Sequence, residues 1–411
     1  MLRLHFFARV KSPGEWSRVE RYSPFFLHPF LNRCIKCIGF FLLFFNKAYG
    51  RTELDIDALP REIFSGNRDR FHVQGISIDQ ERGCIYMSFT TELLKFDLQG
   101  NLIGSVTGIT GHLGCIVLNP DDGLLYGSLE YKNDAIGSGI LKGLGIAKSN
   151  PETAFYIAIF NPDSIRKCGM EASEMMKTVY IKEAVLDYNS QVNQNGRVVD
   201  HRFGCSGIDG VAVAPGVGKN RGRNHLYVAY GIYSDESRND NDYQVLLCYD
   251  VSRWKKFSFP LFAEEPHRNG PMKPNAKYFV RTGNTTWGIQ NLAYDPYNNA
   301  LLAAVYAGKK GDWPNYTLFA IDISKPAKKE KLEGVEPEQK FPVLPLLPLG
   351  AHSEQKNIWG WHFPWGSTGL CPLGNGYYYI SHNSKHKENR KESSTVVLYR
   401  WNGIEPFERV K

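Results

Sequence analysis

Residues 75–97 read GISIDQERGCIYMSFTTELLKFD, and their pattern is the clearest indication of secondary structure in the chain. Apolar and polar side chains alternate along Gly75–Asp79, and two further short apolar runs, Cys84–Thr90 and Leu93–Asp97, follow after polar turns. Runs of this length, rich in Ile, Tyr and Phe and separated by turn formers, are typical of β-strands joined by tight turns. The stretch therefore predicts three consecutive strands.

The same arrangement returns four more times along the chain. Each copy has a first strand opened by Gly or Asn, a second strand usually rich in Tyr, and a third strand that usually closes on Asp or Asn. The first strands begin at Gly75, Gly114, Gly210, Asn291 and Gly369. The second strands span 84–90, 124–130, 226–230, 300–306 and 377–382, the third 93–97, 155–161, 245–250, 318–322 and 396–402, and the candidate fourth 102–108, 178–184, 255–261, 341–347 and 407–411.

A unit of four antiparallel strands that is repeated around an axis is a blade of a β-propeller. The repeat therefore predicts an all-β chain that forms a single β-propeller with five four-stranded blades. Seven blades are the alternative, because the chain is long enough for seven units of about 40 to 50 residues. The composition agrees with either, since 39 Gly, 22 Pro, 22 Tyr and 24 Phe suit short strands and turns better than helices.

The charge pattern argues against a nucleic-acid partner. The formal net charge of +7 is small for a chain of 411 residues, and Lys and Arg cluster only at 325–331 and 385–391, in loop-like sequence. Proteins that bind nucleic acids usually carry a dense basic stripe. We therefore expect no nucleic-acid partner.

Residues 1–50 are predicted to be a secretory signal peptide, and residues 51–411 a single propeller domain. Positive charge at Arg33 and Lys36 precedes an apolar run at 37–45, and the residues after it end on a small-x-small cleavage pattern, Ala48-Tyr49-Gly50. The apolar run is too short for a membrane span, which needs roughly 20 residues. We expect a secreted or periplasmic protein with no membrane insertion after cleavage. The residues that precede this signal are not typical of a signal peptide, and we explain them by the hypothesis that an upstream start codon is misassigned.

Polar and aromatic residues recur at one end of the predicted blades. In a propeller the first strand of each blade is innermost, so the residues that enter first strands and leave second strands meet at one mouth of the central channel. Candidate acid/base residues at these positions are His72, His112, His201 and Tyr230. Candidate substrate-binding residues are Gln74, Glu130, Lys132, Arg202, Asp209, Trp287, Lys309, Trp361 and His382. Further positions at the same mouth are Thr90, Gln290 and Tyr306.

The chain resembles secreted five-bladed β-propeller proteins in general, and we place it in no closer family. The resemblance depends on the Gly-opened first strands and on two turns, NPDDG at 119–123 and DPYNN at 295–299. Five-bladed glycosidases imply two or three carboxylates on inner strands around a sugar, and here only Glu130 and Asp209 are well placed. Propellers that cleave acidic glycans by elimination imply Arg or Lys on the uronate carboxylate and His or Tyr as the base.

Aromatic rings with mixed hydrogen-bonding groups suit sugars, and Arg and Lys would neutralise a carboxylate or sulfate. We therefore expect an exported propeller that acts on or binds an extracytoplasmic glycan, with an acidic glycan favoured, by lyase or hydrolase chemistry. The alternative is a non-catalytic propeller that binds a glycan or a protein through the same mouth.

Two other motifs yield weaker expectations. Acidic side chains follow the second strand of the third copy, and they are a candidate Ca²⁺ site: Asp235, Glu236, Asp240 and Asp242. No other metal or cofactor is expected. The Gly-rich stretch 137–145 lacks the features of a phosphate-binding loop and is predicted to be a flexible loop.

Overall fold

The computed structural model describes residues 55–411, except 69–70, 146–151, 195, 220–221, 263–264, 337, 387 and 389–390. The signal peptide predicted at 1–50 lies outside the described residues and stays a prediction. In the part of the chain that is described, no helix is both long and apolar enough to cross a membrane.

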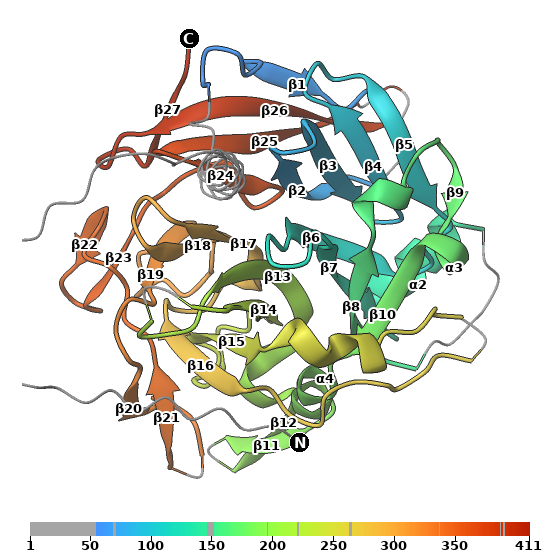
Figure 1. Cartoon of the computed structure of the whole chain (residues 1–411). Coiled ribbons are helices and arrows are strands. Elements are labelled where there is room, and N and C mark those ends of the chain that lie inside the picture. Colours follow the sequence, from blue (N-terminus) through green and yellow to red (C-terminus); the bar gives the residue numbers. More distant parts are fainter. Residues whose placement is uncertain are drawn as a thin grey trace, which may run out of the picture. The chain divides into compact units, whose positions relative to one another are not determined.

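Five antiparallel sheets form a ring in which the first strand of each sheet lies nearest the axis (Figure 1). The all-β propeller prediction with five blades is confirmed, and the seven-blade alternative is wrong. The first blade contains β2 (Val73–Asp79), β3 (Cys84–Phe89), β4 (Glu92–Asp97) and β5 (Leu102–Thr107), and the second contains β6 (His112–Leu118), β7 (Leu125–Tyr131), β8 (Ala154–Phe160) and β10 (Met176–Tyr180). The third contains β13 (Cys205–Pro215), β14 (Asn224–Ile232), β15 (Tyr243–Tyr249) and β16 (Ala276–Arg281). The fourth contains β17 (Thr286–Asp295), β18 (Ala300–Tyr306) and β19 (Leu318–Asp322).

Both ends of the described chain contribute to the fifth blade. Its strands are β24 (Leu370–Gly374), β25 (Tyr377–Lys385) and β26 (Glu392–Trp401), and β26 pairs with both β1 (Glu62–Phe64) and β27 (Phe407–Arg409). The side chain of Ile63 is only 1% exposed and belongs to the core shared by the fifth and first blades. Pairing of β1 with β26 therefore closes the ring.

The outer edges of the blades depart from the repeat. The predicted fourth strand at 255–261 is wrong, because the side chain of Asp250 accepts a hydrogen bond from Ser252 N and starts a 3₁₀ helix, η3 (Val251–Lys256). The fourth strand of this blade is β16. In the second blade, the fourth strand predicted at 178–184 ends early, because β10 stops at Tyr180 and α4 (Lys182–Tyr188) follows.

The fourth blade has no regular fourth strand among the described residues. In place of the strand predicted at 341–347, Leu346 makes an isolated bridge with Ile321 of β19. The residues before it form β21 (Lys340–Val343), which pairs with β20 (Lys328–Lys331) and, in parallel, with β16. The remaining short elements lie between blade strands: β9 (Met170–Glu171), β11 (Gln191–Gln194), β12 (Arg197–Asp200), β22 (Ala351–Ser353), β23 (Ile358–Gly360), α2 (Ala135–Gly143), α3 (Ala172–Met175), η1 (Pro162–Ser164) and η2 (Arg202–Gly204).

Close contact of the innermost strands explains the Gly that opens most of them. A Cβ atom on Gly75 would lie 2.8 Å from the Cα of Cys115 in the next blade, and one on Gly210 would lie 2.9 Å from Ile289 Cγ2. In the fourth blade the equivalent residue is Asn291, which is 1% exposed. Its Nδ2 donates to the carbonyl oxygens of Gln74 and Ser367, both at 2.8 Å.

The innermost strands of four blades carry irregularities near their first residues. Register shifts occur in β2 after Val73, in β6 after Leu113, in β13 after Ile208 and in β17 after Ile289. A bulge inserts a residue into one strand and changes the direction of its side chain. The residues at three of these shifts, Gln74, Asp209 and Gln290, line one cavity.

Ring closure by β1 is tested by truncating its buried side chain. Ile63→Ala is expected to lower the free energy of unfolding by about 2 to 5 kcal/mol, because it leaves a cavity in a packed core. The matched control is Phe64→Ala on the same strand, where the side chain is 51% exposed and the expected change is about 0.5 kcal/mol. Denaturant unfolding of both variants measures the difference, and equal effects would contradict closure by β1.

Candidate functional site

A cavity of about 360 Å³ lies at the end of the propeller where the innermost strands begin. We call it the mouth cavity. Its polar lining comes from His72, Gln74, Thr90, His112, Lys132, Ser206, Asp209, Gln290 and Tyr306, and its apolar lining from Phe71, Ala135, Gly139, Ile140 and Trp287. The volume is within the range of small-molecule sites, which usually combine apolar walls with a few convergent polar groups.

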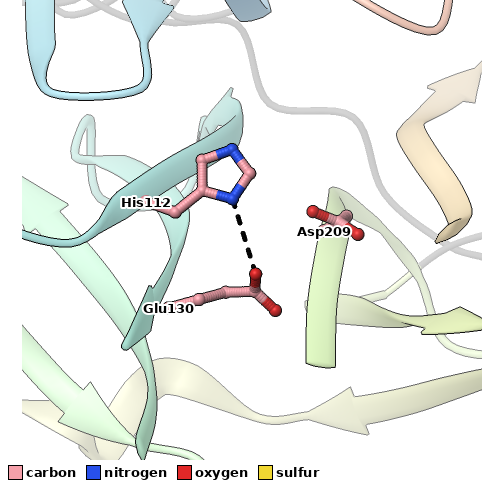
Figure 2. Close-up of side chains that lie close together, drawn as sticks. All are labelled: His112, Glu130 and Asp209. Atoms are coloured by element: carbon pink, nitrogen blue, oxygen red, sulfur yellow. Dashed lines mark ion pairs between the residues drawn. The ribbon is translucent and has the colours of Figure 1, made fainter. Parts of the chain in front are cut away.

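A buried ion pair connects the lining residue Lys132 to Glu130, which lies behind the lining. The Glu130 side chain, whose residue is 3% exposed, places Oε2 at 2.8 Å from Lys132 Nζ. The same oxygen lies 3.5 Å from His112 Nδ1, and Figure 2 shows this contact as a dashed line. Its other oxygen, Oε1, accepts a hydrogen bond from Ile208 N at 2.6 Å. Residue 207 is Gly with a φ of +125°, and a Cβ there would overlap Glu130 Oε1. The backbone of the third blade is thus shaped around this carboxylate.

The ion pair keeps both of its members charged. Burial alone would favour the neutral acid, but the Lys132 ammonium and the His112 ring hold the pKa of Glu130 below its ordinary value. Burial likewise opposes the charge of Lys132, but Glu130 and Asp209 raise the pKa of its ammonium group. Lys132 Nζ also donates to the carbonyl oxygen of Ser206 at 3.1 Å. The cavity floor therefore contains a fixed positive and a fixed negative charge.

Asp209 behaves differently from Glu130. Its side chain lines the cavity, and Oδ2 accepts a hydrogen bond from Gln290 Nε2 at 3.1 Å. Burial, and next the negative charge of Glu130, raise the pKa of Asp209 to about 7. A carboxyl group with such a pKa can both take up and release a proton near neutral pH, which is the property required of a general acid or base.

The other side of the cavity carries a neutral imidazole. Burial, then the proximity of His112 and Lys385, lower the pKa of His72 to about 4. His72 Nε2 lies 3.3 Å from Nε2 of Gln74, which also donates to Thr90 Oγ1 at 3.1 Å. Side-chain contacts thus fix the orientation of this ring, and it can offer a ligand hydrogen bonds without a charge.

The positions of these side chains also bear on whether the cavity binds a metal ion. His112, Glu130 and Asp209 each offer one atom of a ligand type, and these atoms lie within 4.8 Å of one another (Figure 2). The Lys132 ammonium lies 2.8 Å from Glu130 Oε2, so the chain already supplies a cation there. Three of the four residues of the candidate Ca²⁺ site contact partners in the protein: Asp240 binds Arg238, Asp242 binds Lys310, and Asp235 accepts from Ser237.

The structure brings together a part of the predicted site. His72, Gln74, His112, Lys132, Asp209 and Trp287 all line the mouth cavity, and Glu130 lies behind it. Thr90, Gln290 and Tyr306 also line it, as their repeat positions predict. The stretch 137–145, predicted to be a flexible loop, contributes most of α2, and Gly139 and Ile140 of this helix form a part of the wall.

Tyr230 is fully buried in the core and does not line the cavity. Neighbouring side chains along a strand point to opposite faces, and the following residue, Gly231, faces the lining residues Ser206, Trp287 and Asp209. A Cβ on Gly231 would lie 3.0 Å from Asp209 Oδ2. Burial raises the pKa of Tyr230 well above its ordinary value, which makes the phenol a poor acid or base.

Neither His201 nor Arg202 lines the cavity. The His201 ring lies between Tyr188 and Tyr233, with its Nδ1 at 2.6 Å from the Tyr188 carbonyl oxygen. Tyr233 in turn packs against Trp287 at the cavity. The guanidinium of Arg202 lies 4.9 Å from the ring centre of Phe203.

Three further candidates have contacts away from the cavity. Lys309 is exposed. Trp361 is buried and packs edge-on against Trp401. The His382 ring stacks on Trp365 at 4.0 Å and contacts the Tyr399 hydroxyl at 2.9 Å, and burial lowers its pKa.

Five lining residues were not predicted at all: Phe71, Ser206, and Ala135, Gly139 and Ile140 of α2. Phe71 precedes an innermost strand and Ser206 lies at the start of one. Their positions in the repeat are therefore a signal that could have identified them. Ile140 had no signal, because a Gly-rich stretch does not predict a helix over a cavity.

A larger crevice of about 1130 Å³ lies at the opposite strand ends of the second and third blades. Three of its carboxylates, all from aspartates, have partners within the protein. Asp121 accepts from Asn224, Asp122 accepts from the Tyr126 hydroxyl, and Asp250 caps η3. The mouth cavity is therefore the stronger candidate for chemistry.

Comparisons with known proteins leave the function open. No protein-family model matches the chain, and no curated protein matches it. Among solved structures, the chain is similar to the holo form of the pyranose dehydrogenase PQQ domain from Coprinopsis cinerea, with a TM-score of 0.32 and 11% identity over 78% of this chain and 81% of that one. It is also similar to the Dos1 propeller, with a TM-score of 0.27 and 12% identity over 82% of this chain and 81% of that one. Both likenesses are too distant to bear on function.

The buried ion pair yields a stability prediction. Lys132→Met is expected to lower the free energy of unfolding by about 3 to 5 kcal/mol, because it leaves the Glu130 carboxylate buried without its cation. The double variant Glu130→Gln with Lys132→Met should recover a large part of this loss. Denaturant unfolding at pH 7 measures both.

The control removes the exposed pair of Arg400 and Glu408, and no measurable change is expected there, since water screens such pairs. A single Lys132→Met variant as stable as the wild type would show that Glu130 does not depend on this ammonium.

Proposed function

We propose that this protein is an exported enzyme that binds a sugar unit of an extracytoplasmic glycan in the mouth cavity, with Asp209 as the group that transfers a proton. The observation that carries the proposal is the placement of this carboxyl group in the cavity wall beside the Glu130 and Lys132 pair. Clusters of interacting, buried ionisable groups in a cavity are typical of active sites.

The proton-transfer role of Asp209 has an electrostatic cause. Glu130 stays ionised because Lys132 and His112 compensate for its burial. Its negative charge in turn opposes ionisation of Asp209. One carboxyl is thus held charged and its neighbour is held close to half-protonated at neutral pH, which is how two acids in one site acquire different roles.

The walls of the cavity suit a sugar. Trp287 is 37% exposed at the cavity, and the rings of Phe71 and Tyr306 also line it. Amide, hydroxyl and imidazole groups from Gln74, Thr90 and His72 are held by one another. Aromatic faces against the carbon-bound hydrogens, with hydrogen-bonding groups around the hydroxyls, are the features that a pyranose ring requires.

Export and glycan specificity are parts of the same proposal. The apolar run at 37–45 and the following Ala48-Tyr49-Gly50 pattern support a cleaved leader. A glycan outside the cytoplasm is the substrate such a protein would meet. Lyase and hydrolase chemistry both use a positioned acid or base.

A non-catalytic glycan-binding protein is the second candidate. The exposed ring of Trp287 supports it, because an aromatic platform binds sugar without any proton transfer. In that case Trp287 would matter more than Asp209.

Replacement of one side chain separates the two candidates. Asp209→Asn is expected to lower turnover of a glycan substrate by roughly 10²- to 10⁴-fold, as for the loss of a general acid or base, and to leave binding intact. The substrate is first found by incubating the wild type with a panel of polysaccharides and measuring the ends released. Calorimetry then measures oligosaccharide binding.

Trp287→Ala is the comparison variant, and it should weaken binding while the rate at saturation is kept. Full turnover by Asp209→Asn would refute the catalytic role. Binding without turnover by the wild type, lost in Trp287→Ala, would establish the non-catalytic alternative.

A further inference from the structure

The charged groups of the mouth cavity indicate the charge of its ligand. Among the described residues that line it, Asp209 is the only carboxylic acid, whereas Lys132 is a cation and His72 and His112 contribute imidazole rings. The other acid in the cluster, Glu130, lies behind the lining and has both oxygens engaged. The lining thus offers a ligand basic groups and one protonatable acid.

We infer that the mouth cavity takes a sugar that bears a carboxylate, a uronate unit, and that Asp209 binds this carboxylate in its protonated form. The inference rests on the proposed function and names its substrate class. A protonated carboxyl group donates a hydrogen bond to a carboxylate, and the two acids then share one proton between them. Lys132 supplies the positive charge beside this pair.

The neighbours of Asp209 determine how this arrangement depends on pH. Glu130 from β7, Lys132 just after it, His112 from β6 and Tyr306 from β18 are the titratable groups around Asp209, and Gln290 from β17 donates a hydrogen bond to it. A second carboxylate in the cavity adds to the repulsion from Glu130, so it binds best when Asp209 has taken up a proton. Burial and Glu130 already raise the pKa of Asp209 to about 7, so this proton is available below that pH.

The sign of the pH effect follows from linkage. A ligand that binds only the protonated form of Asp209 loses affinity as the pH rises above about 7, by about tenfold per pH unit. A ligand that needs the ionised form gains affinity over the same interval. A neutral sugar changes little.

The test compares three uronates with their parent sugars. Binding of glucuronate, galacturonate and mannuronate, and of glucose, galactose and mannose, is measured by saturation-transfer NMR and calorimetry between pH 5.5 and 8.5. At least one uronate should bind more tightly than its parent sugar below pH 7, and its affinity should fall as the pH rises. Calorimetry in buffers of different ionisation enthalpy should detect proton uptake on binding.

Asp209→Asn is the diagnostic variant, because an amide is a neutral donor like the protonated acid. It should keep the affinity for the uronate and lose the decline above pH 7. The control is Lys309→Met, which removes an exposed charge outside the lining and should leave affinity and its pH dependence unchanged.

Three results would overturn the inference. They are equal binding of uronates and parent sugars, affinity for uronates that rises with pH, and an unchanged pH profile in Asp209→Asn. Failure here is distinct from failure of the proposed function, because a neutral glycan turned over by the wild type and not by Asp209→Asn would refute the uronate and retain the enzyme.

Discussion

The close packing of innermost strands at the axis is the constraint on which the rest of the structure depends. Asn291 contributes most directly, because its side chain binds the carbonyl oxygens of Gln74 and Ser367 and accepts from Cys115 Sγ at 3.4 Å. One buried amide thus connects the innermost segments of four blades. Such contacts bring residues far apart in the sequence to a common wall. The mouth cavity lies at the end where these strands begin, and at Gly75 and Gly210 the strands are too close for a side chain.

Departures from regular geometry concentrate around this cavity. Bulges place Gln74, Asp209 and Gln290 in its lining. Trp287 has a φ of +65°, which is costly for a bulky residue, and such strain is often retained at functional sites. The buried charges of Glu130 and Lys132 are a further cost that a purely structural design would avoid. Their combined effect on Asp209, a carboxyl that titrates near neutral pH, is what the proposed chemistry requires.

The sequence predicts the blades well and the details of the mouth only in part. The five strands that open with Gly or Asn identify the innermost layer, because burial restricts which residues these strands can contain. The outer edges of the blades, such as 255–261 and 341–347, are less restricted by packing, so their structure differs from blade to blade. The residues that enter the innermost strands of the first three blades include His72, His112 and Asp209. A shift of one residue explains the misplacement at Tyr230, since strand alternation directs Gly231 toward the lining residue Asp209. At Lys309 the side chain is exposed, and it is the next residue, Lys310, whose buried ammonium binds Asp242. Neither bulges nor α2 could be inferred from local patterns.

The protonation of Asp209 is the center of this account, and its titration can be measured directly. Difference infrared spectroscopy of the carboxyl C=O band, wild type against Asp209→Asn, follows this one group between pH 3 and pH 9. Because burial and Glu130 raise the pKa of Asp209 to about 7, the account predicts a protonated carboxyl band that disappears with a midpoint near pH 7. A midpoint near the ordinary value of about 3.9 would show a permanently ionised aspartate and would contradict the account.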